Sequence, residues 1–141
     1  MANGDFTVTL TLTGTKNSGD AIETLSETFT KSSVVESYER EITVPTTLTS
    51  ILTVGTLGAS GLATLNGFII WNDDPANFVT VGVLLAATDA YYQKLPAKRF
   101  MVVWSRDFDA TTGGVAGTLV NATLINAQAD TAGVVCKIRA F

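Results

Sequence analysis

Residues 67–85 read Gly-Phe-Ile-Ile-Trp-Asn-Asp-Asp-Pro-Ala-Asn-Phe-Val-Thr-Val-Gly-Val-Leu-Leu, which is two apolar runs around one polar turn. The runs, 68–71 and 78–85, are apolar on both faces, as strands buried between two layers are. Asx side chains and Pro75 favour a turn between them, because Asx groups bond the backbone ahead and proline cannot continue a ladder. Gly82 indicates a bulge or a close backbone approach. We therefore predict a β-hairpin at the centre of an antiparallel sandwich.

Short segments rich in β-branched and aromatic residues lie on both sides of this stretch. They cover residues 5–13, 22–29, 33–44, 46–54, 99–104, 119–128 and 134–141. In 22–29 the apolar spacing also fits a helix face, but the interleaved threonines favour a strand. Together these segments make about eight to ten short strands with frequent turns, which is typical of a sandwich or jelly roll. We predict one all-β, jelly-roll-like antiparallel β-sandwich domain over residues 1–141, with little or no helix.

The first of these strands, over 5–13, alternates without interruption. One face carries Phe6, Val8, Leu10 and Leu12, and the other carries Thr7, Thr9, Thr11 and Thr13. Period-two alternation is the pattern of a half-buried strand. The threonine face is expected to meet either solvent or a neighbouring subunit.

Composition favours a protein that packs against other subunits. Apolar residues make up 46% of the 141 residues, charged residues only 16%, and the net charge is −4. A surface with so little charge is easily desolvated. The nine scattered Lys and Arg residues do not form the basic stripe that binds nucleic acid. No apolar run approaches the roughly 20 residues of a membrane helix, and the N-terminus lacks the pattern of a signal peptide, so we expect cytoplasmic synthesis.

Catalytic residues are scarce. The chain has no histidine and a single cysteine, Cys136, so the commonest general base and an ordinary zinc site are both lacking. Cys136 lies in an alternating strand and is predicted to be a small core residue. Two acidic pairs, Asp73 with Asp74 and Asp107 with Asp109, offer oxygen ligands for calcium or carboxylates for glycoside hydrolysis. Each pair also lies where turns favour Asp. We therefore predict no enzyme activity, no cofactor and no metal site.

The aromatic residues and the long polar segment 105–118 suggest where contacts form. Trp71 and Trp104 lie in apolar strands and are expected in the core, whereas Tyr91 and Tyr92 are adjacent and should point to opposite faces. One tyrosine should then be buried and the other exposed in a contact. Long polar loops are commonly functional. The predicted interface residues are Thr7, Thr9, Thr11, Tyr91, Tyr92, Asp107, Phe108 and Asp109.

The stretch from Phe68 to Val83 resembles a pattern in small virion proteins of tailed bacteriophages: a strand ending in Asn, an Asp-containing turn, and then Asn-aromatic/Val-x-Val-Gly. The likeness continues with Tyr92-Gln-Lys-Leu-Pro96, the strand Phe100–Trp104 and the closing Val135-Cys-Lys-Ile138. It covers roughly residues 67–141. Residues 97–99 read Ala-Lys-Arg, where the family has an acidic-Gly-Glu turn.

This resemblance implies a non-enzymatic, jelly-roll-like subunit of a virus particle. It points to a capsid decoration or cement protein on the capsid surface, made in the host cytoplasm. Its expected partners are copies of itself, for example in a trimer, and the major capsid protein, with no nucleic acid and no membrane. Two alternatives stay open: a carbohydrate-binding sandwich at a phage tail that uses Tyr91 or Tyr92 with loop aspartates to bind glycan, and a structural component of the tail or neck.

Overall fold

The computed structural model describes residues 4–15, 18–19, 21–34, 37–55, 61–85, 90–104, 107–109 and 119–141. These residues form thirteen strands and, within the described ranges, no helix. None of them therefore belongs to a helix of the length and hydropathy needed to cross a membrane. The chain divides into two compact units, Met1–Val35 and Glu36–Phe141.

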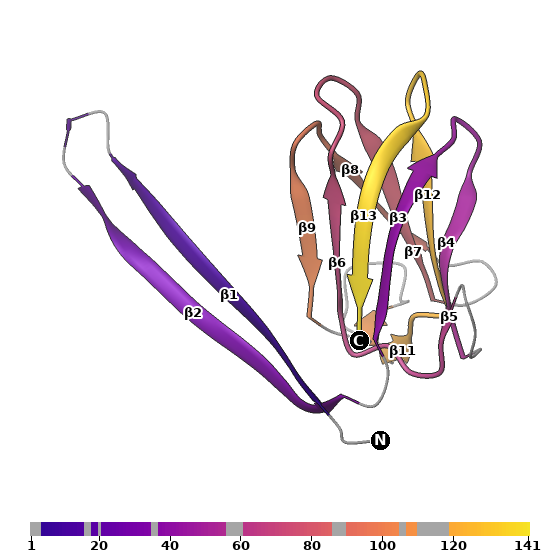
Figure 1. Ribbon diagram of the computed structural model, residues 1–141, viewed down its shortest axis with the longest axis horizontal. Coiled ribbons are helices and arrows are strands. Elements are labelled where there is room, and N and C mark those ends of the chain that lie inside the picture. Colours follow the sequence, from indigo (N-terminus) through magenta and orange to yellow (C-terminus); the bar gives the residue numbers. More distant parts are fainter. Residues whose placement is uncertain are drawn as a thin grey trace. The chain divides into compact units, whose positions relative to one another are not determined.

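The first unit is a ribbon of two antiparallel strands, β1 (Gly4–Thr15) and β2 (Ala21–Val34), which we call the arm (Figure 1). The strands predicted over 5–13 and 22–29 are thus confirmed, because the threonines outweigh the helix-like apolar spacing in the second. We expected the first strand inside the sandwich. Instead, β1 forms a two-stranded sheet with β2, and among the described residues the sheets of the sandwich are built from 38–141.

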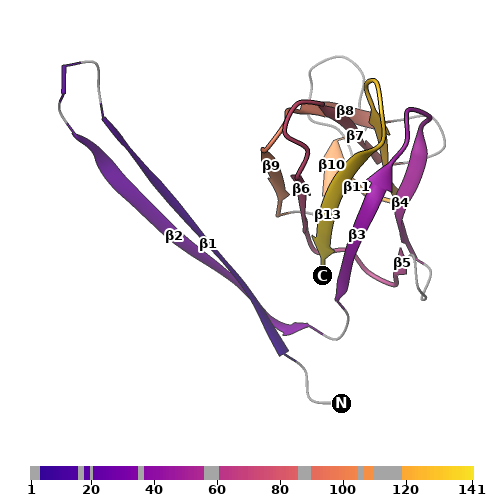
Figure 2. The same cartoon turned by 45° about the horizontal axis from the view of Figure 1, so that its top comes forward.

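The second unit consists mainly of two stacked sheets (Figure 2). One sheet has the order β3-β13-β6-β9, and the other has the order β5-β4-β12-β7-β8. The strands are β3 (Tyr38–Val44), β4 (Thr49–Val54), β5 (Gly61–Leu62), β6 (Phe68–Asn72), β7 (Val79–Leu84), β8 (Ala90–Leu95), β9 (Phe100–Val103), β12 (Leu124–Ala129) and β13 (Val134–Ala140).

The pairing of these strands is nested. β3 pairs with β13, β4 with β12, β6 with β9 and β7 with β8, all of them antiparallel. The first of these eight strands thus pairs with the last, the second with the seventh, and so on inward, which is the topology of a jelly roll. The short β5 adds a parallel edge strand beside β4. The predicted all-β antiparallel sandwich is confirmed.

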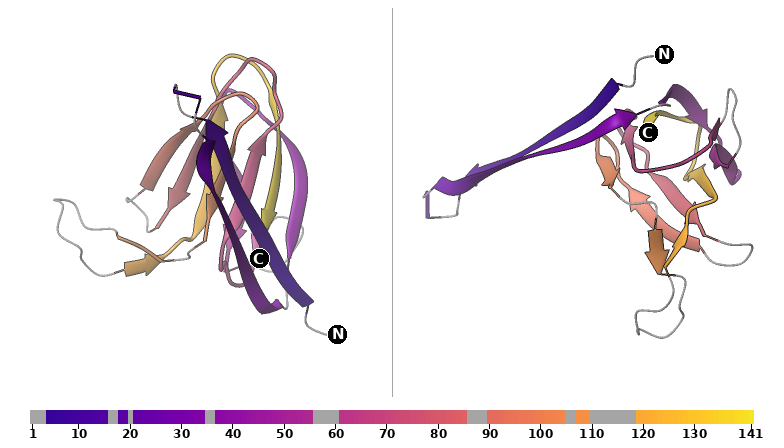
Figure 3. Two further views of the ribbon diagram at one scale, coloured as in Figure 1. Left: turned by 90° about the vertical axis from the view of Figure 1, so that its left-hand side faces the viewer. Right: turned by 90° about the horizontal axis from the view of Figure 1, so that it is seen from below.

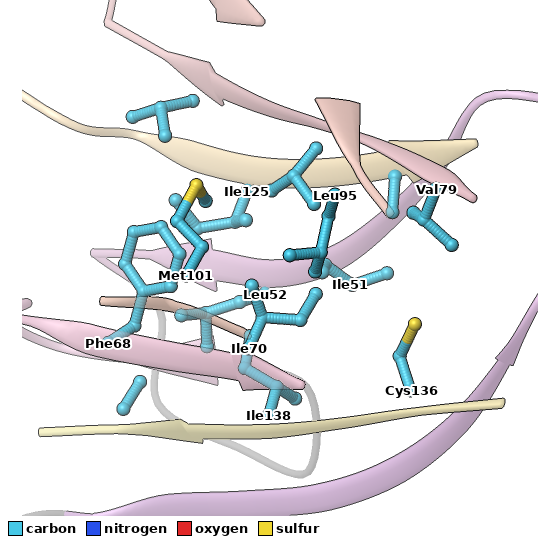
Figure 4. Close-up of a cluster of buried hydrophobic side chains, with 14 of the residues drawn as sticks. Ile51, Leu52, Phe68, Ile70, Val79, Leu95, Met101, Ile125, Cys136 and Ile138 are labelled. Carbon is cyan, nitrogen blue, oxygen red and sulfur yellow. The ribbon is translucent and has the colours of Figure 1, made fainter. Parts of the chain in front are cut away.

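The core lies between the two sheets (Figure 4). Phe68, Ile70 and Ile138 point inward from one sheet and meet Leu52 and Ile125 of the other, all five without exposed surface. Residues alternate strictly between buried and exposed along β13, as expected for a strand with one face on the core. Apolar side chains removed from water in this way are the main source of the stability of the sandwich.

Cys136 is part of this core, as predicted. Its side chain lies within β13 and has no exposed surface. Burial disfavours the thiolate and raises the pKa of Cys136 to about 12. Cys136 therefore packs as a small apolar residue in its thiol form.

The predicted central hairpin is wrong. β6 and β7 belong to different sheets, and residues 73–78 carry the chain from one layer to the other. The buried side chain of Asn72 accounts for this path, because its Nδ2 donates to the carbonyl oxygens of Asn77 at 2.9 Å, Leu95 at 3.2 Å and Pro96 at 3.1 Å. The inward residues of both runs, such as Ile70 and Val81, are buried in the core, and the two strands do not pair with each other.

The Asx side chains of residues 72 and 74 accept backbone N–H groups of this segment, as the sequence suggested. The segment is an arch between two sheets, however, and not a hairpin turn. The Oδ1 of Asn72 accepts the N–H of Asp74 at 3.0 Å. The Oδ1 of Asp74 accepts the N–H groups of Ala76 at 2.8 Å and Asn77 at 2.7 Å. These backbone donors favour the carboxylate and lower the pKa of Asp74.

Gly82 is a close-approach site, which confirms one of the two predictions for it. It lies in register with Asn126 on one neighbouring strand and with Tyr92 on the other. A Cβ at this position would collide with the Oδ1 of Asn126 and lie 2.6 Å from the Tyr92 ring. Only glycine leaves room for both neighbours on this face of the sheet.

A short ribbon of β10 (Asp107–Asp109) and β11 (Leu119–Asn121) lies outside the two sheets (Figure 3). Residues 105–118 were predicted to be one long loop, but residues 107–109 form a strand of this ribbon. The other residues of that predicted loop, 105–106 and 110–118, are outside the described ranges.

Candidate interaction surfaces

The threonine face of the arm is exposed and internally bonded. Three cross-strand pairs of hydroxyl oxygens lie 3.2 Å apart: Thr7 with Thr30, Thr9 with Thr28, and Thr11 with Ser26. Such cross-strand pairs stabilise a two-stranded sheet. The predicted interface residues Thr7, Thr9 and Thr11 therefore lie on one open face, where their hydroxyl groups already bond within the ribbon.

The opposite face of the arm is apolar. Register places Val8 opposite Phe29, Leu10 opposite Glu27, and Leu12 opposite Leu25. We call these six residues, which are apolar except for Glu27, the arm's apolar face. Leu12 and Leu25 are each 52% exposed. The sequence predicted a half-buried strand over residues 5–13 with Leu12 on its apolar face, but the side chain of Leu12 is about half open to solvent.

A second exposed apolar surface lies on the outer side of the sheet β3-β13-β6-β9. Trp71 is in register with Phe100, and Ile69 with Val102, across the pair β6 and β9; we call these four residues the aromatic face. The rings of Trp71 and Phe100 stack with centroids 6.0 Å apart. Trp71 was expected in the core, but it is 46% exposed because the inward positions of β6 are Phe68, Ile70 and Asn72.

Charged residues continue this outer surface across β13 and β3. Across the pair β13 and β6, Lys137 is in register with Trp71, and Arg139 is in register with Ile69. Arg139 pairs with Glu39 at 2.7 Å, and Lys137 lies 3.9 Å from Glu41. The outer face of this sheet therefore has an apolar half on β6 and β9 and a charged half on β13 and β3.

Trp104 lies just beyond β9 and is half-buried. Its ring packs at 4.9 Å, centroid to centroid, on that of Phe141, which is buried. This placement is close to the core role that the sequence suggested for Trp104. The two tryptophans thus differ because residue 71 points outward from the sheet and residue 104 packs against the C-terminal residue.

Tyr91 and Tyr92 are both exposed, at 51% and 50%. They were predicted to divide into one buried and one exposed side chain. β8 is the edge strand of its sheet, and its residues 90–94 are all exposed, so the inward-pointing Tyr91 also meets solvent. The hydroxyl of Tyr91 donates to the Oε1 of Gln93 at 3.0 Å.

The carboxylates of the 73–78 crossing have protein partners. Asp73 Oδ1 lies 2.7 Å from Lys98 Nζ, and Asp73 Oδ2 lies 3.3 Å from Lys137 Nζ. The hydrogen bond from Lys98, followed by that from Lys137, lowers the pKa of Asp73. Lys98 adopts the left-handed conformation, with φ of 54°. Lys98 thus supplies Asp73 with a nearby cation.

The remaining predicted interface residues are Asp107, Phe108 and Asp109. Their backbone forms β10, which pairs with residues 119–121 of β11. Their side chains are outside the described part of the structure. The structure therefore brings together Thr7, Thr9 and Thr11 on the arm, and Tyr91 and Tyr92 on β8, as separate sets on separate strands.

The aromatic face was missed in the sequence analysis, although a signal for it exists. Residues 135, 137 and 139 alternate as Val, Lys and Arg, which marks the outward side of β13. In any strand that pairs with β13, the residues in register with 135, 137 and 139 point to this same outer face. The position of Trp71 then depends on the register between β6 and β13, and only the fold supplies that register.

Known proteins add no family assignment, because no family model, curated protein or solved structure matches the chain. Within the described ranges, no group of three or more His, Cys, Asp or Glu side chains is placed to hold a metal ion. The surfaces with the most distinctive chemistry are therefore the arm's apolar face, the aromatic face and the exposed tyrosines of β8.

Proposed function

We propose that this chain is a structural subunit of a tailed-bacteriophage particle, and that it acts as a decoration or cement protein on the capsid. In this role the sandwich binds across joints of the shell, and repeated contacts resist internal pressure. Contacts that are weak singly become strong when many copies act together. The partners are other copies of the chain and the major capsid protein.

The single observation that carries this proposal is the arm. A two-stranded ribbon is marginally stable at best in water, yet this one extends over residues 4–34 and exposes leucines on one face. An exposed apolar face of this kind is typical of a protein-interaction surface. A subunit that gains contacts on assembly has a use for such an arm, whereas a free-standing monomer does not.

Two further features support the proposal. The nested strand order is that of the jelly roll, a fold used in viral capsid proteins and also in lectins. The sequence resemblance to small virion proteins covers residues 67–141, which include six of the eight jelly-roll strands. Fold alone does not assign function, so the arm remains the main argument.

Particle stoichiometry tests this proposal. Phage particles produced from the genome that encodes the chain are purified and analysed by quantitative mass spectrometry. A capsid decoration protein should be present in numbers comparable to the major shell protein and should map to the shell by electron microscopy. A few copies at the tail would support the tail or neck alternative, and absence from the particle would overturn the virion role.

A second function, glycan binding, is favoured by the exposed tyrosines of β8. Tyr91 and Tyr92 present half of their surface at the edge of a sheet, where an aromatic ring can stack on a sugar and a hydroxyl can bond to it. Binding on a glycan array that is lost in Tyr91→Ala or Tyr92→Ala, and kept in Phe100→Ala, would support this reading. Binding that neither tyrosine variant reduces would exclude this site.

A further inference from the structure

We propose that the arm of one copy of this chain packs its apolar face on the aromatic face of a second copy, with Glu27 beside Lys137 and Arg139. The inference rests on the structural role proposed above and names the partner for one of its contacts. Three observations carry it: the pattern of side chains on the arm, the matching pattern on the sheet, and the area that the two can bury.

The arm presents two columns of side chains with different chemistry. The column on β1 is apolar throughout, with Val8, Leu10 and Leu12. The column on β2 places one acidic residue, Glu27, between Leu25 and Phe29. Within the described ranges Glu27 makes no ion pair. A surface that receives the arm must therefore be apolar, with a cation near one side.

The outer face of the sheet β3-β13-β6-β9 has this arrangement. The columns on β9 and β6 are apolar, with Phe100 and Val102 on the first, and Ile69 and Trp71 on the second. The next column, on β13, carries Lys137 and Arg139 in register with Trp71 and Ile69. An apolar strip two strands wide thus lies beside a cationic column.

The two patterns match when β1 of one copy lies over β6 and β9 of the second copy, and β2 of the first copy lies toward β13 of the second. Glu27 then reaches Lys137 and Arg139, and the flanking Leu25 and Phe29 cover apolar surface. The present partners of these cations are the exposed Glu39 and Glu41 and the half-buried Asp73. Exposed ion pairs of this kind contribute little to stability, so the cations can take an additional acidic partner.

The area of this contact sets its strength. Two strands cover a width of about 10 Å, and the receiving strands β6 and β9 are about 15 Å long, so each side buries on the order of 150 Å². A stable pair of free subunits commonly buries about 800 Å² per partner. Each copy has one arm and one aromatic face, so reciprocal or ring-closing exchange doubles the area per subunit. We therefore expect weak association in solution and stronger association where copies are concentrated on a particle.

Disulfide trapping tests this contact, because it detects weak association. Cys136 is buried and is the single native cysteine, so an engineered surface thiol is the reactive one. One full-length copy carries Glu27→Cys, and a second, tagged copy carries Lys137→Cys or, in a separate variant, Arg139→Cys. The mixture in a glutathione redox buffer should form the mixed dimer at least roughly tenfold faster than either copy forms its own dimer.

Matched variants give the controls. Thr9→Cys, on the opposite face of the ribbon, should give only background cross-linking to Lys137→Cys. Adding Trp71→Asp to the receiving copy should reduce trapping to background. Leu48→Asp, at an exposed leucine outside both faces, should leave the trapping rate unchanged. Circular dichroism verifies that each variant is folded.

Several outcomes would overturn the inference. Fast trapping of the Glu27→Cys copy alone would mean that arms pack on arms, and fast trapping of the Lys137→Cys copy alone would mean that sheet faces pack together. A chain with both cysteines that closes only within itself would place the arm on its own copy. No trapping at about 1 mM protein would exclude the contact. Any of these results leaves the particle stoichiometry, and so the proposed virion role, to be judged separately.

Discussion

The arm and the sandwich use the same strand pattern, with apolar and polar residues in alternation, but the outcome differs. In β13 the inward residues, including Ile138, have no exposed surface because a second sheet covers them. In the arm the corresponding residues include Leu12 and Leu25, each 52% exposed. Alternation therefore predicts that a face is apolar, but it does not tell which chain covers that face.

This difference separates a unit that is stabilised by its own core from one whose apolar residues remain partly open to solvent. The sandwich buries more than twenty apolar side chains between its sheets, whereas the arm has hydroxyl pairs on one face and partly open leucines on the other. Regions with few buried apolar contacts open at low free-energy cost. The following predictions test whether the two units differ in stability as this contrast requires.

Hydrogen exchange should show the largest difference. At low protein concentration, amides of β1 and β2 should exchange with opening free energies of about 0–2 kcal/mol, because the ribbon is marginal alone. Amides of β12 and β13 should exchange near the global unfolding free energy, about 5–15 kcal/mol. Mass-spectrometric exchange on the intact chain measures both regions. Equal protection of the arm and β13 would contradict the contrast.

Truncation of a core residue should give the second-largest difference between the two units. Phe68→Ala should lower the free energy of unfolding by about 3–5 kcal/mol, because it leaves a cavity in a fully buried site. The matched change in the arm, Leu12→Ala, should cost less than about 1 kcal/mol in the monomer. Urea denaturation of both variants gives the comparison. A Leu12→Ala variant as damaged as Phe68→Ala would mean that the arm's apolar face is covered within the chain.

Asn72→Ala should have a smaller but clear effect on the sandwich. It removes the amide that bonds three carbonyl oxygens at the crossing between sheets, at a cost of about 1–3 kcal/mol for groups left without a partner. Asn121→Ala, at an exposed position, should change stability by less than about 0.5 kcal/mol. Thermal unfolding of the two variants measures the difference, and an Asn72→Ala protein as stable as the wild type would remove the proposed role of Asn72.

The smallest expected effect is on pH dependence. The folded pKa values of Asp73 and Asp74 lie below the ordinary value of 3.8, so their contribution to stability is fully present above about pH 3.8 and is lost as pH falls through the folded values. Lys98→Met removes the main partner of Asp73 and should raise its pKa. Acid denaturation of Lys98→Met should therefore show less pH-dependent destabilisation from Asp73 than the wild type does. Identical curves would show that the Lys98 pair does not contribute.

Much of the secondary structure could be predicted from the sequence, because strand periodicity and turn residues are local signals. The predicted strands over 134–141 and 99–104 correspond to β13 and β9, and Cys136 lies in the core as predicted. The predicted pairing of residues 68–71 with 78–85 was wrong. A polar link with Asx residues and proline suits a hairpin turn and an arch between layers equally well.

The sequence by itself determined that the chain forms strands, that β1 has one threonine face and one apolar face, and that histidine chemistry is absent. The tertiary structure alone decided which strands are neighbours, since pairing such as that of β3 with β13 joins residues about one hundred positions apart. That register placed Trp71 on an open face and Gly82 under the side chains of Asn126 and Tyr92. The physical reason is that periodicity is encoded locally, whereas burial depends on which distant segment covers each face.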